Sequence, residues 1–335
     1  MTNPPLIVDH TAFVQAQSEL TTALRHAAPG GITALVGLAG SGKSEIRWAV
    51  MRALFGDANA WGTGQLPATL LLAKPVERGL YNSKDMATRL VQAVQDPTLD
   101  WLKQRNEVAN ADVVHLINQM KLESSKWATL RRETTEPAML RQFIDSAIAR
   151  GLRLLAIEQA GSMTHVKRGT PPSHHLASLM CTAMEAKIHI LLIGVPATSY
   201  LWVGNEEVSR RTQRITIRRY RYDVEADRVC VASLLIGLTP GLDQRERDLM
   251  FKRIDWIFAS TLGVYDELHQ FVGRALSAKR HSGSKFLKDE HLQLAIHPEV
   301  RLEALYASAT LLDTVTKATD AATAISLMRE SLKDP

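Results

Sequence analysis

Residues 37–44, which read GLAGSGKS, have the types and spacing that bind phosphate groups, since they fit the pattern G-x-x-x-x-G-K-[ST]. In this pattern the glycines let backbone N–H groups close around phosphate oxygens. Lys43 reaches the outer phosphates, and the hydroxyl of Ser44 can ligate Mg²⁺. The pattern predicts ATP and Mg²⁺ as cofactors. The residues expected at the nucleotide are Gly37, Gly40, Ser41, Gly42, Lys43, Ser44 and Glu45.

A second candidate site lies at the end of the apolar run 154–157, where Glu158 and Gln159 stand side by side. In nucleotide hydrolases with a phosphate loop, a strand ends in an acid that holds Mg²⁺, and a second acid commonly orients the attacking water. Glu158 takes the metal-side position and Gln159 the water-side position. An amide cannot accept a proton as a carboxylate can, so we expect slow hydrolysis and a long-lived ATP-bound state.

Two other interpretations of this pair stay open. Glu158 could be the catalytic carboxylate itself, with the metal held by Ser44, waters and phosphates. Alternatively, the strand could be ordinary core and Glu158 a solvent-facing residue at its end.

The elements that would position these residues follow from the hydrophobic pattern. An apolar strand at 32–36 leads into the phosphate loop, and a helix at 44–55 follows it. Further strands are predicted at 68–73, 152–157, 188–196 and 215–220, and further helices at 83–94, 138–150 and 173–186, with the polar stretch 99–136 helical in pieces. Strands that alternate with helices predict a parallel sheet with helices on both faces.

No buried strand is predicted beyond Asp223. Helices are expected at 224–238, 244–262, 265–281, 288–295 and 299–332. A chain of 335 residues with 45% hydrophobic content has room for one large or two modest domains. We therefore expect a nucleotide-binding α/β domain at 1–223 and an α-helical lid with C-terminal helices at 224–335.

Charge and hydropathy bear on two kinds of partner, nucleic acids and membranes. Lys and Arg total 40 against 35 Asp and Glu, which gives a net charge of +5. This small excess is compatible with nucleic-acid binding and does not establish it. No apolar run approaches the length of a membrane span, and the N-terminus lacks the basic and apolar parts of a signal peptide. The sequence predicts a cytoplasmic protein without a membrane partner.

The order of these parts resembles an AAA+ ATPase and, within that class, the TnsC/TniB-like regulators of DNA transposition. The resemblance runs through most of the chain. It depends on HTAFVQAQSEL, GLAGSGKSE, RGLRLLAIEQAGSM, IHILLIGVPATSYLWVGNEEVSRRTQRI and TLGVYDELHQFVGRALSAKRHSGSKFLKDEHLQLA. It implies an AAA+ P-loop three-layer sandwich with a parallel sheet, followed by an all-α lid.

The same resemblance implies that ATP sits between neighbouring subunits. Arg210 and Arg211 match the position from which an arginine of one subunit reaches the γ-phosphate of the next. The alternative is that the stretch RRTQRITIRR is simply a basic surface. Hydrolysis in such a protein would be carried by Glu158 and Gln159 of one subunit with these arginines of its neighbour.

The resemblance further implies a ring or filament of subunits wound around duplex DNA. Such an assembly contacts phosphates rather than bases and links target-selection proteins to a transposase. The candidate DNA-binding residues are Lys121, Lys126, Arg131, Arg132, Lys167 and Arg168.

Two other function classes stay open. The chain could be an AAA+ switch that uses ATP to hold a protein partner without touching DNA, or a helicase-loader-like ATPase not dedicated to transposition. A lid arginine often contacts nucleotide in AAA+ proteins, whereas the stretch TLGVYDELHQF carries none. A small-molecule kinase is disfavoured because no acceptor-pocket signature is present.

Overall fold

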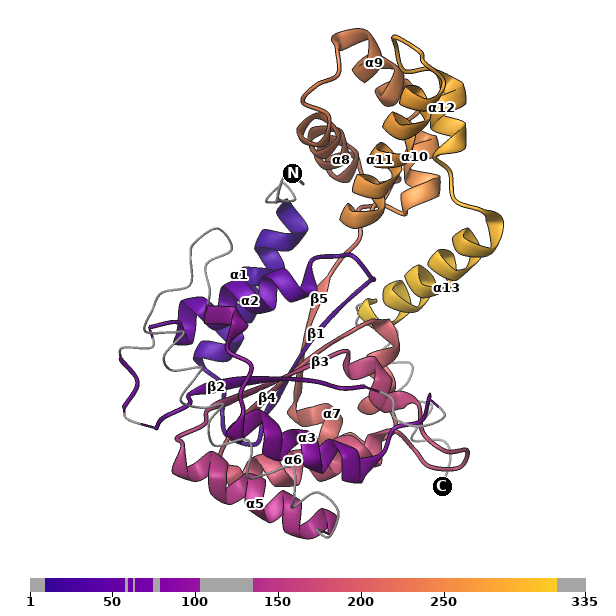
Figure 1. Cartoon of the computed structure of the whole chain (residues 1–335). Helices are drawn as coiled ribbons and strands as arrows, with labels where there is room; N and C mark the ends of the chain where they lie inside the picture. Colours follow the sequence, from indigo (N-terminus) through magenta and orange to yellow (C-terminus); the bar gives the residue numbers. More distant parts are fainter. Residues whose placement is uncertain (1–9, 58–59, 63, 75–78, 103–134, 318–335) are drawn as a thin grey trace.

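The computed structural model describes residues 10–57, 60–62, 64–74, 79–102 and 135–317. Its first part is built on a five-stranded sheet with the strand order β2-β3-β4-β1-β5 (Figure 1). All four strand pairings are parallel. The strands are β1 (Ile32–Gly37), β2 (Ala68–Leu72), β3 (Leu154–Glu158), β4 (His189–Gly194) and β5 (Thr212–Ile217).

The register of the sheet brings the carboxyl ends of its strands to one edge. Ile32 pairs with Thr212 at the amino ends of β1 and β5, and Gly37 pairs with Ile217 at their carboxyl ends. Every residue of the central strands β1 and β4 is buried, as expected of parallel strands that are covered on both faces. Ligands of open α/β sheets bind at this carboxyl edge.

Two helical layers cover the sheet. Helices α1 (Thr11–Arg25) and α2 (Lys43–Phe55) pack on each other. On the opposite side lie α3 (Ser83–Gln95), α5 (Glu136–Ala149), α6 (Ser173–Ala186) and the short α7 (Glu206–Arg211) (Figure 1). The connection from β1 to β2 runs across the sheet in the opposite direction to the connections β2 to β3, β3 to β4 and β4 to β5. Because crossovers between parallel strands are right-handed, the helix of the first connection lies on one face of the sheet and the helices of the other three lie on the opposite face.

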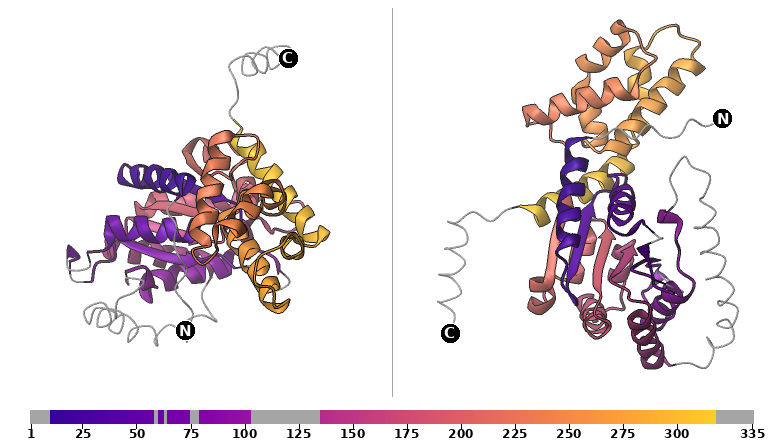
Figure 2. Two further views of the ribbon diagram at one scale, coloured as in Figure 1. Left: turned by 90° about the horizontal axis from the view of Figure 1, so that it is seen from above. Right: turned by 90° about the vertical axis from the view of Figure 1, so that its left-hand side faces the viewer.

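The second part of the chain is helical. It contains α8 (Glu225–Leu238), α9 (Gln244–Lys252), α10 (Ile254–Thr261), α11 (Tyr265–His281) and α12 (Asp289–Leu294). These helices share a second hydrophobic core, which includes the fully buried side chains of Ile257, Leu268 and Phe271. Ala12 of α1 and Tyr220 of the link after β5 also belong to it. Figure 2 shows this helical part at one end of the α/β part, above the carboxyl edge of the sheet.

Helix α13 (Glu299–Thr316) returns from the helical part to the sheet (Figures 1 and 2). Its buried side chains, Leu305, Ala309 and Leu312, belong to the large core of the α/β part. Polar contacts join α13 to both parts: Arg301 with Glu267 of α11 (2.7 Å), Tyr306 with the carbonyl of Ala259 (3.2 Å), and Asp313 with Arg219 (2.5 Å).

The predicted fold class is confirmed: a parallel sheet lies between two helical layers, and an all-helical region follows. We propose a domain boundary near residue 223, in the link between β5 and α8. In space, α13 packs with the first domain although it follows the second in sequence. Within the described residues, no helix is both long and apolar enough to cross a membrane.

Several predicted elements differ from the structure. The helix expected at 299–332 ends at Thr316 in α13, and its residues from 318 onward, like most of the stretch 99–136, lie outside the described residues. The single helix expected at 244–262 is two helices that meet at Arg253, whose side chain lies over the ring of Trp256 (4.5 Å) and pairs with Asp289 of α12 (2.7 Å). The strand expected at 215–220 is β5, which begins earlier, at Thr212, in register with the start of β1. It ends before Arg218, which turns to pair with Asp227 of α8 (2.7 Å).

Candidate functional site

The phosphate loop connects β1 to the amino end of α2. Gly40 and Gly42 have positive φ angles of 72° and 86°, which favour glycine over every other residue. The hydroxyl of Ser41 is buried and has no hydrogen-bond partner among the described residues. A buried polar group without a partner indicates a bound molecule or water at that place. The loop therefore fits a ligand with oxygen atoms.

Lys43 occupies the centre of this loop. Its ammonium group donates hydrogen bonds to the backbone carbonyls of Gly37 (2.9 Å) and Leu38 (2.5 Å). Burial lowers the pKa of Lys43 to about 8, because the charged form loses its hydration there. The lysine thus lies where phosphate oxygens would replace the carbonyls as its partners.

The lowered pKa of Lys43 predicts a pH dependence of ATP binding. Below pH 8 the free protein presents a cation to the phosphates; above pH 8 the amine is neutral and must take up a proton to bind them. We expect the affinity for ATP to fall about 20-fold between pH 7.5 and pH 9.5. Titration with a fluorescent ATP analogue measures this change.

A matched control is Lys43→Arg, because a guanidinium stays charged throughout this range. The pH dependence should disappear in that variant. Calorimetry in two buffers should detect proton uptake by the wild-type protein at pH 9 and none at pH 7. Equal affinities at both pH values in the wild-type protein would contradict a role for the Lys43 charge.

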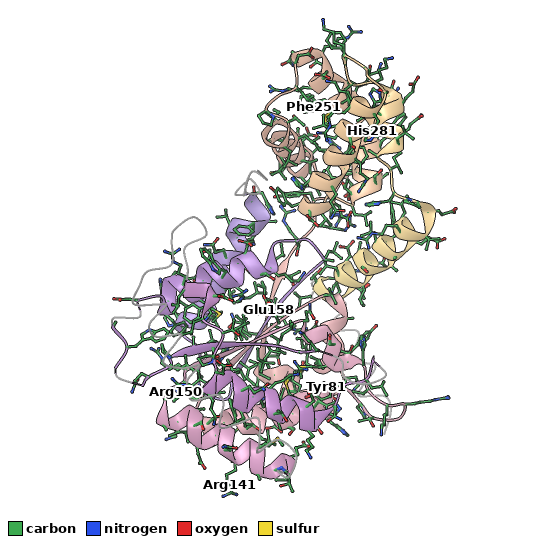
Figure 3. The ribbon with its side chains drawn as sticks, viewed as in Figure 1. Tyr81, Arg141, Arg150, Glu158, Phe251 and His281 are labelled. Atoms are coloured by element: carbon green, nitrogen blue, oxygen red, sulfur yellow. The ribbon has the colours of Figure 1, made fainter. Side chains whose placement is uncertain are left out.

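Glu158 ends β3 and is half-buried next to the phosphate loop; it lies near the centre of the α/β part in Figure 3. Its Oε1 atom forms an ion pair with Arg47 of α2, at 3.1 Å from Nη2 and 3.2 Å from Nε. The pair joins residues 111 positions apart in the chain. Glu158 is therefore not a solvent-facing strand end.

Gln159 follows in a left-handed backbone conformation, with φ 54° and ψ 35°. Non-glycine residues with such angles cluster at functional sites, where the surrounding structure holds them. The carbonyl of Gln159 accepts a hydrogen bond from the amide of Ser162 (2.8 Å). This bond fixes the sharp turn from β3 into the 3₁₀ helix η5 (Ala160–Thr164).

One cavity of about 360 Å³ unites the two predicted motifs. Its walls include Lys43 and Ser44 from the phosphate loop, Glu158 and Gln159 from the end of β3, and Gly194 from the end of β4. The strand order places β4 between β1 and β3, which explains why residues from distant segments meet here. The structure thus brings together four of the predicted residues, Lys43, Ser44, Glu158 and Gln159. The other residues predicted at the nucleotide, Gly37, Gly40, Ser41, Gly42 and Glu45, do not line this cavity.

The residues present fit ATP and Mg²⁺. The phosphates would be held by the amides of the loop, the amino end of α2 and Lys43, which together provide positive charge. Magnesium prefers oxygen ligands, and the hydroxyl of Ser44 and the carboxylate of Glu158 share the cavity. Glu45 lies half-buried in the first turn of α2.

The helical part contacts the phosphate loop directly. The amide of Asp266, in the first turn of α11, donates to the carbonyl of Gly40 (3.3 Å). A side chain at Gly40 would collide with Asp266, because the Cβ atoms would be 2.4 Å apart. A glycine is therefore required here for α11 to approach the loop.

A narrow hollow lined by rings adjoins the loop on the lid side. It includes Leu38, His10, Tyr220 and Tyr265. His10 accepts or donates a hydrogen bond with the Tyr220 hydroxyl (2.8 Å) and stacks on Tyr265 with ring centroids 5.4 Å apart. The free volume of this hollow is about 10 Å³, so its rings pack against one another and leave no room for a nucleobase.

The predicted arginines lie at the other edge of the sheet. Arg210 and Arg211 end α7, directly before Thr212, which pairs with the first residue of β1. Arg210 is exposed, and Arg211 lies 3.8 Å from Glu207 of its own helix. The length of β1 separates them from the phosphate loop by roughly 17 Å. They are not part of the cavity that holds Lys43 and Glu158.

Two of the candidate DNA-binding residues are described. Lys167 and Arg168 are exposed in the turn that follows η5, closed by a hydrogen bond from the amide of Thr170 to the carbonyl of Lys167 (3.1 Å). Lys121, Lys126, Arg131 and Arg132 lie outside the described residues.

Sequence reasoning missed Arg47, Asp266 and the ring-lined hollow. Arg47 carried a signal, since it is a charged residue on the apolar face of α2 beside Ile46 and Val50. Asp266 and Tyr265 carried none, because their position depends on how the helical part docks on the sheet.

No protein-family model matches the chain, and no curated protein matches it. Among solved structures, it is similar to the ORC2 protein of Aeropyrum pernix in its ADPNP and ADP complexes, with a TM-score of 0.49, 12% identity, and coverage of 90% of this chain and 71% of that one. It is also similar to a Walker-type ATPase of Pyrococcus abyssi, with a TM-score of 0.48, 14% identity and 89% coverage of both chains.

A third similar structure is domain III of the replication initiation protein DnaA from Thermotoga maritima. Its TM-score is 0.43 at 12% identity, with coverage of 87% of this chain and 95% of that one. Identities this low and TM-scores below 0.5 leave the function to be decided by the site itself.

Proposed function

We propose that the chain is an ATP-binding switch of the AAA+ class whose subunits assemble when ATP is bound. The observation that carries this proposal is the phosphate loop. Its Ser41 hydroxyl is buried without a hydrogen-bond partner among the described residues, and its Lys43 ammonium donates hydrogen bonds to two backbone carbonyls. Both groups have the chemistry to receive phosphate oxygens.

The chemistry follows from the chain's own residues. Lys43 and the loop amides bind and orient the phosphates, and Gln159 orients a water in the cavity without removing its proton. Bound Mg²⁺ would neutralise charge on the phosphates. Because the residue at the water position is an amide, we propose that hydrolysis is slow and that the ATP-bound state persists.

The position of Arg210 supports an action between subunits. At roughly 17 Å from the phosphate loop of its own chain, this exposed guanidinium cannot reach its own nucleotide. It can meet the γ-phosphate of a neighbour that docks against this edge of the sheet. We propose Arg210 and Arg211 as the residues that make assembly depend on ATP.

We expect the double substitution Arg210→Ala with Arg211→Ala to leave ATP binding by dilute monomer within about twofold of the wild-type value and to weaken assembly about tenfold or more. The reason is that the arginines act on a neighbour's nucleotide. Fluorescence titration and light scattering measure the two properties. A matched control is Arg214→Ala, on the exposed face of β5. Loss of ATP affinity in dilute monomer would place the arginines in the subunit's own site.

The finer proposal is a cytoplasmic regulator of DNA transposition that winds on duplex DNA as a ring or filament and links target-selection proteins to a transposase. It rests on the sequence resemblance and on the exposed Lys167 and Arg168 in the turn after η5. A protein-interaction switch that does not touch DNA, or a helicase-loader-like ATPase, remains the alternative.

Electron microscopy with an ATP analogue, with and without duplex DNA, separates these functions. Assemblies that form only when both are present support the DNA-bound regulator, and Lys167→Ala with Arg168→Ala should then weaken them. Assemblies that form with the analogue alone, unchanged by DNA, support the protein-interaction switch. A chain that stays monomeric under all conditions contradicts ATP-dependent assembly.

A further inference from the structure

Arg47 is the arginine of α2 that lies inside the α/β part. Its exposed fraction is 8%, and it lies in the second turn of the helix, four positions after Lys43 and next to the buried Ile46. Arginine is almost never buried to this degree unless a charged group pairs with it. Another arginine of the same helix, Arg52, lies over the ring of Trp48 and is more exposed.

The partner of Arg47 is the carboxylate at the centre of the candidate site. Both Nη2 and Nε contact the Oε1 atom of Glu158, at 3.1 Å and 3.2 Å. The second carboxylate oxygen takes part in neither contact. The Glu158 side chain is 20% exposed, and its exposed part lines the cavity that also contains Lys43 and Ser44. The ion pair thus joins the helix behind the phosphate loop to the strand end that carries Gln159.

This arrangement determines the charge that a nucleotide meets. An unpaired carboxylate beside the phosphates would repel them, and the repulsion would be strong at low effective dielectric. Arg47 cancels that charge from the protein side. It also prevents the carboxylate from turning away from the cavity, because two guanidinium nitrogens share one oxygen.

We infer that Arg47 is a positioning residue for Glu158: it fixes the carboxylate at the wall of the phosphate cavity and neutralises it, so that ATP binds with little dependence on Mg²⁺. The inference rests on the proposed function, because it concerns the same nucleotide site. It adds a residue for which the phosphate-binding pattern has no position.

The test compares the affinity for a fluorescent ATP analogue in the presence of Mg²⁺ with that in EDTA. Arg47→Met removes the cation and keeps an apolar stem, so the released carboxylate repels the phosphates unless Mg²⁺ is present. We expect the ratio of the two affinities to rise on the order of tenfold. Glu158→Gln should act in the opposite direction and lower the ratio below the wild-type value, since Arg47 is then an unopposed cation.

Three further variants complete the test. Arg47→Met combined with Glu158→Gln should bring the ratio back towards the wild-type value, because the two substitutions act on one interaction. Arg47→Lys should keep the ratio close to wild type. Arg52→Met serves as the control on the same helix and should leave the ratio unchanged. Thermal unfolding of each variant reports whether it is folded.

The outcomes separate this inference from the proposed function. If Arg47→Met lowers both affinities equally, or if Glu158→Gln leaves the ratio unchanged, Arg47 serves only to stabilise the fold and the inference is wrong. The proposed function survives that result as long as the wild-type protein binds ATP and Lys43→Ala does not. If the wild-type protein binds no nucleotide in either condition, both fail. Should Arg47→Met not fold, the shift of the ratio in Glu158→Gln alone decides.

Discussion

Replacement of Lys43 by alanine is expected to weaken ATP binding strongly and, with it, ATP-dependent assembly. The ammonium group lies inside the phosphate loop, 2.9 Å from the carbonyl of Gly37, where its charge would be shared with phosphate oxygens. Hydrogen bonds to charged groups that are shielded from water contribute about 1.5–3 kcal/mol each. Loss of this group should therefore lower the affinity about 100-fold, as measured by titration with a fluorescent ATP analogue.

The control for this prediction is Lys84→Ala, which removes an exposed lysine from α3 on the other side of the sheet. That variant should bind ATP and assemble as the wild-type protein does. An unchanged affinity in folded Lys43→Ala would count against the whole site, since Lys43 is the cation expected to bind the outer phosphates.

The second large effect is expected from Gln159→Glu. Glutamate has almost the shape of glutamine, so the left-handed conformation at φ 54° costs both residues about the same. The new carboxylate can accept a proton from water in the cavity, whereas the amide cannot. We expect the ATPase rate to rise about 10²-fold, the lower end for a positioned general base. Steady-state phosphate release measures the rate.

Faster hydrolysis should also shorten the lifetime of ATP-dependent assemblies. Glu158→Gln is the companion measurement. If Glu158 is itself the catalytic carboxylate, Glu158→Gln stops residual turnover and Gln159→Glu changes little. If neither variant changes the rate, the end of β3 is not the hydrolytic site.

Local patterns were sufficient to predict much of the fold. The helices at 173–186 and 265–281 have the bounds that apolar periodicity and charged or polar ends predicted. The central strands were predictable because burial on both faces makes them continuous apolar runs. Parallel pairing followed from the alternation of strands and helices, and the phosphate loop followed from its glycines.

Features that depend on distant contacts were not predictable in the same way. The break at Arg253 serves a contact with Asp289, 36 residues later. The ion pair of Arg47 with Glu158 joins residues that are 111 positions apart. The sequence therefore predicted the phosphate loop and the end of β3, but not the ion pair that connects them. The approach of Asp266 to Gly40 depends on how a separate hydrophobic core docks.

The return of α13 to the sheet has a mechanical consequence for nucleotide exchange. The helical lid is tethered to the α/β part twice, through the link after β5 and through α13, whose Leu305 and Leu312 are anchored in the large core. Any movement that separates Asp266 from the carbonyl of Gly40 would have to bend the chain at the link after β5 and at α13 together. A force applied to α13 would therefore act on the contact between the helical part and the phosphate loop.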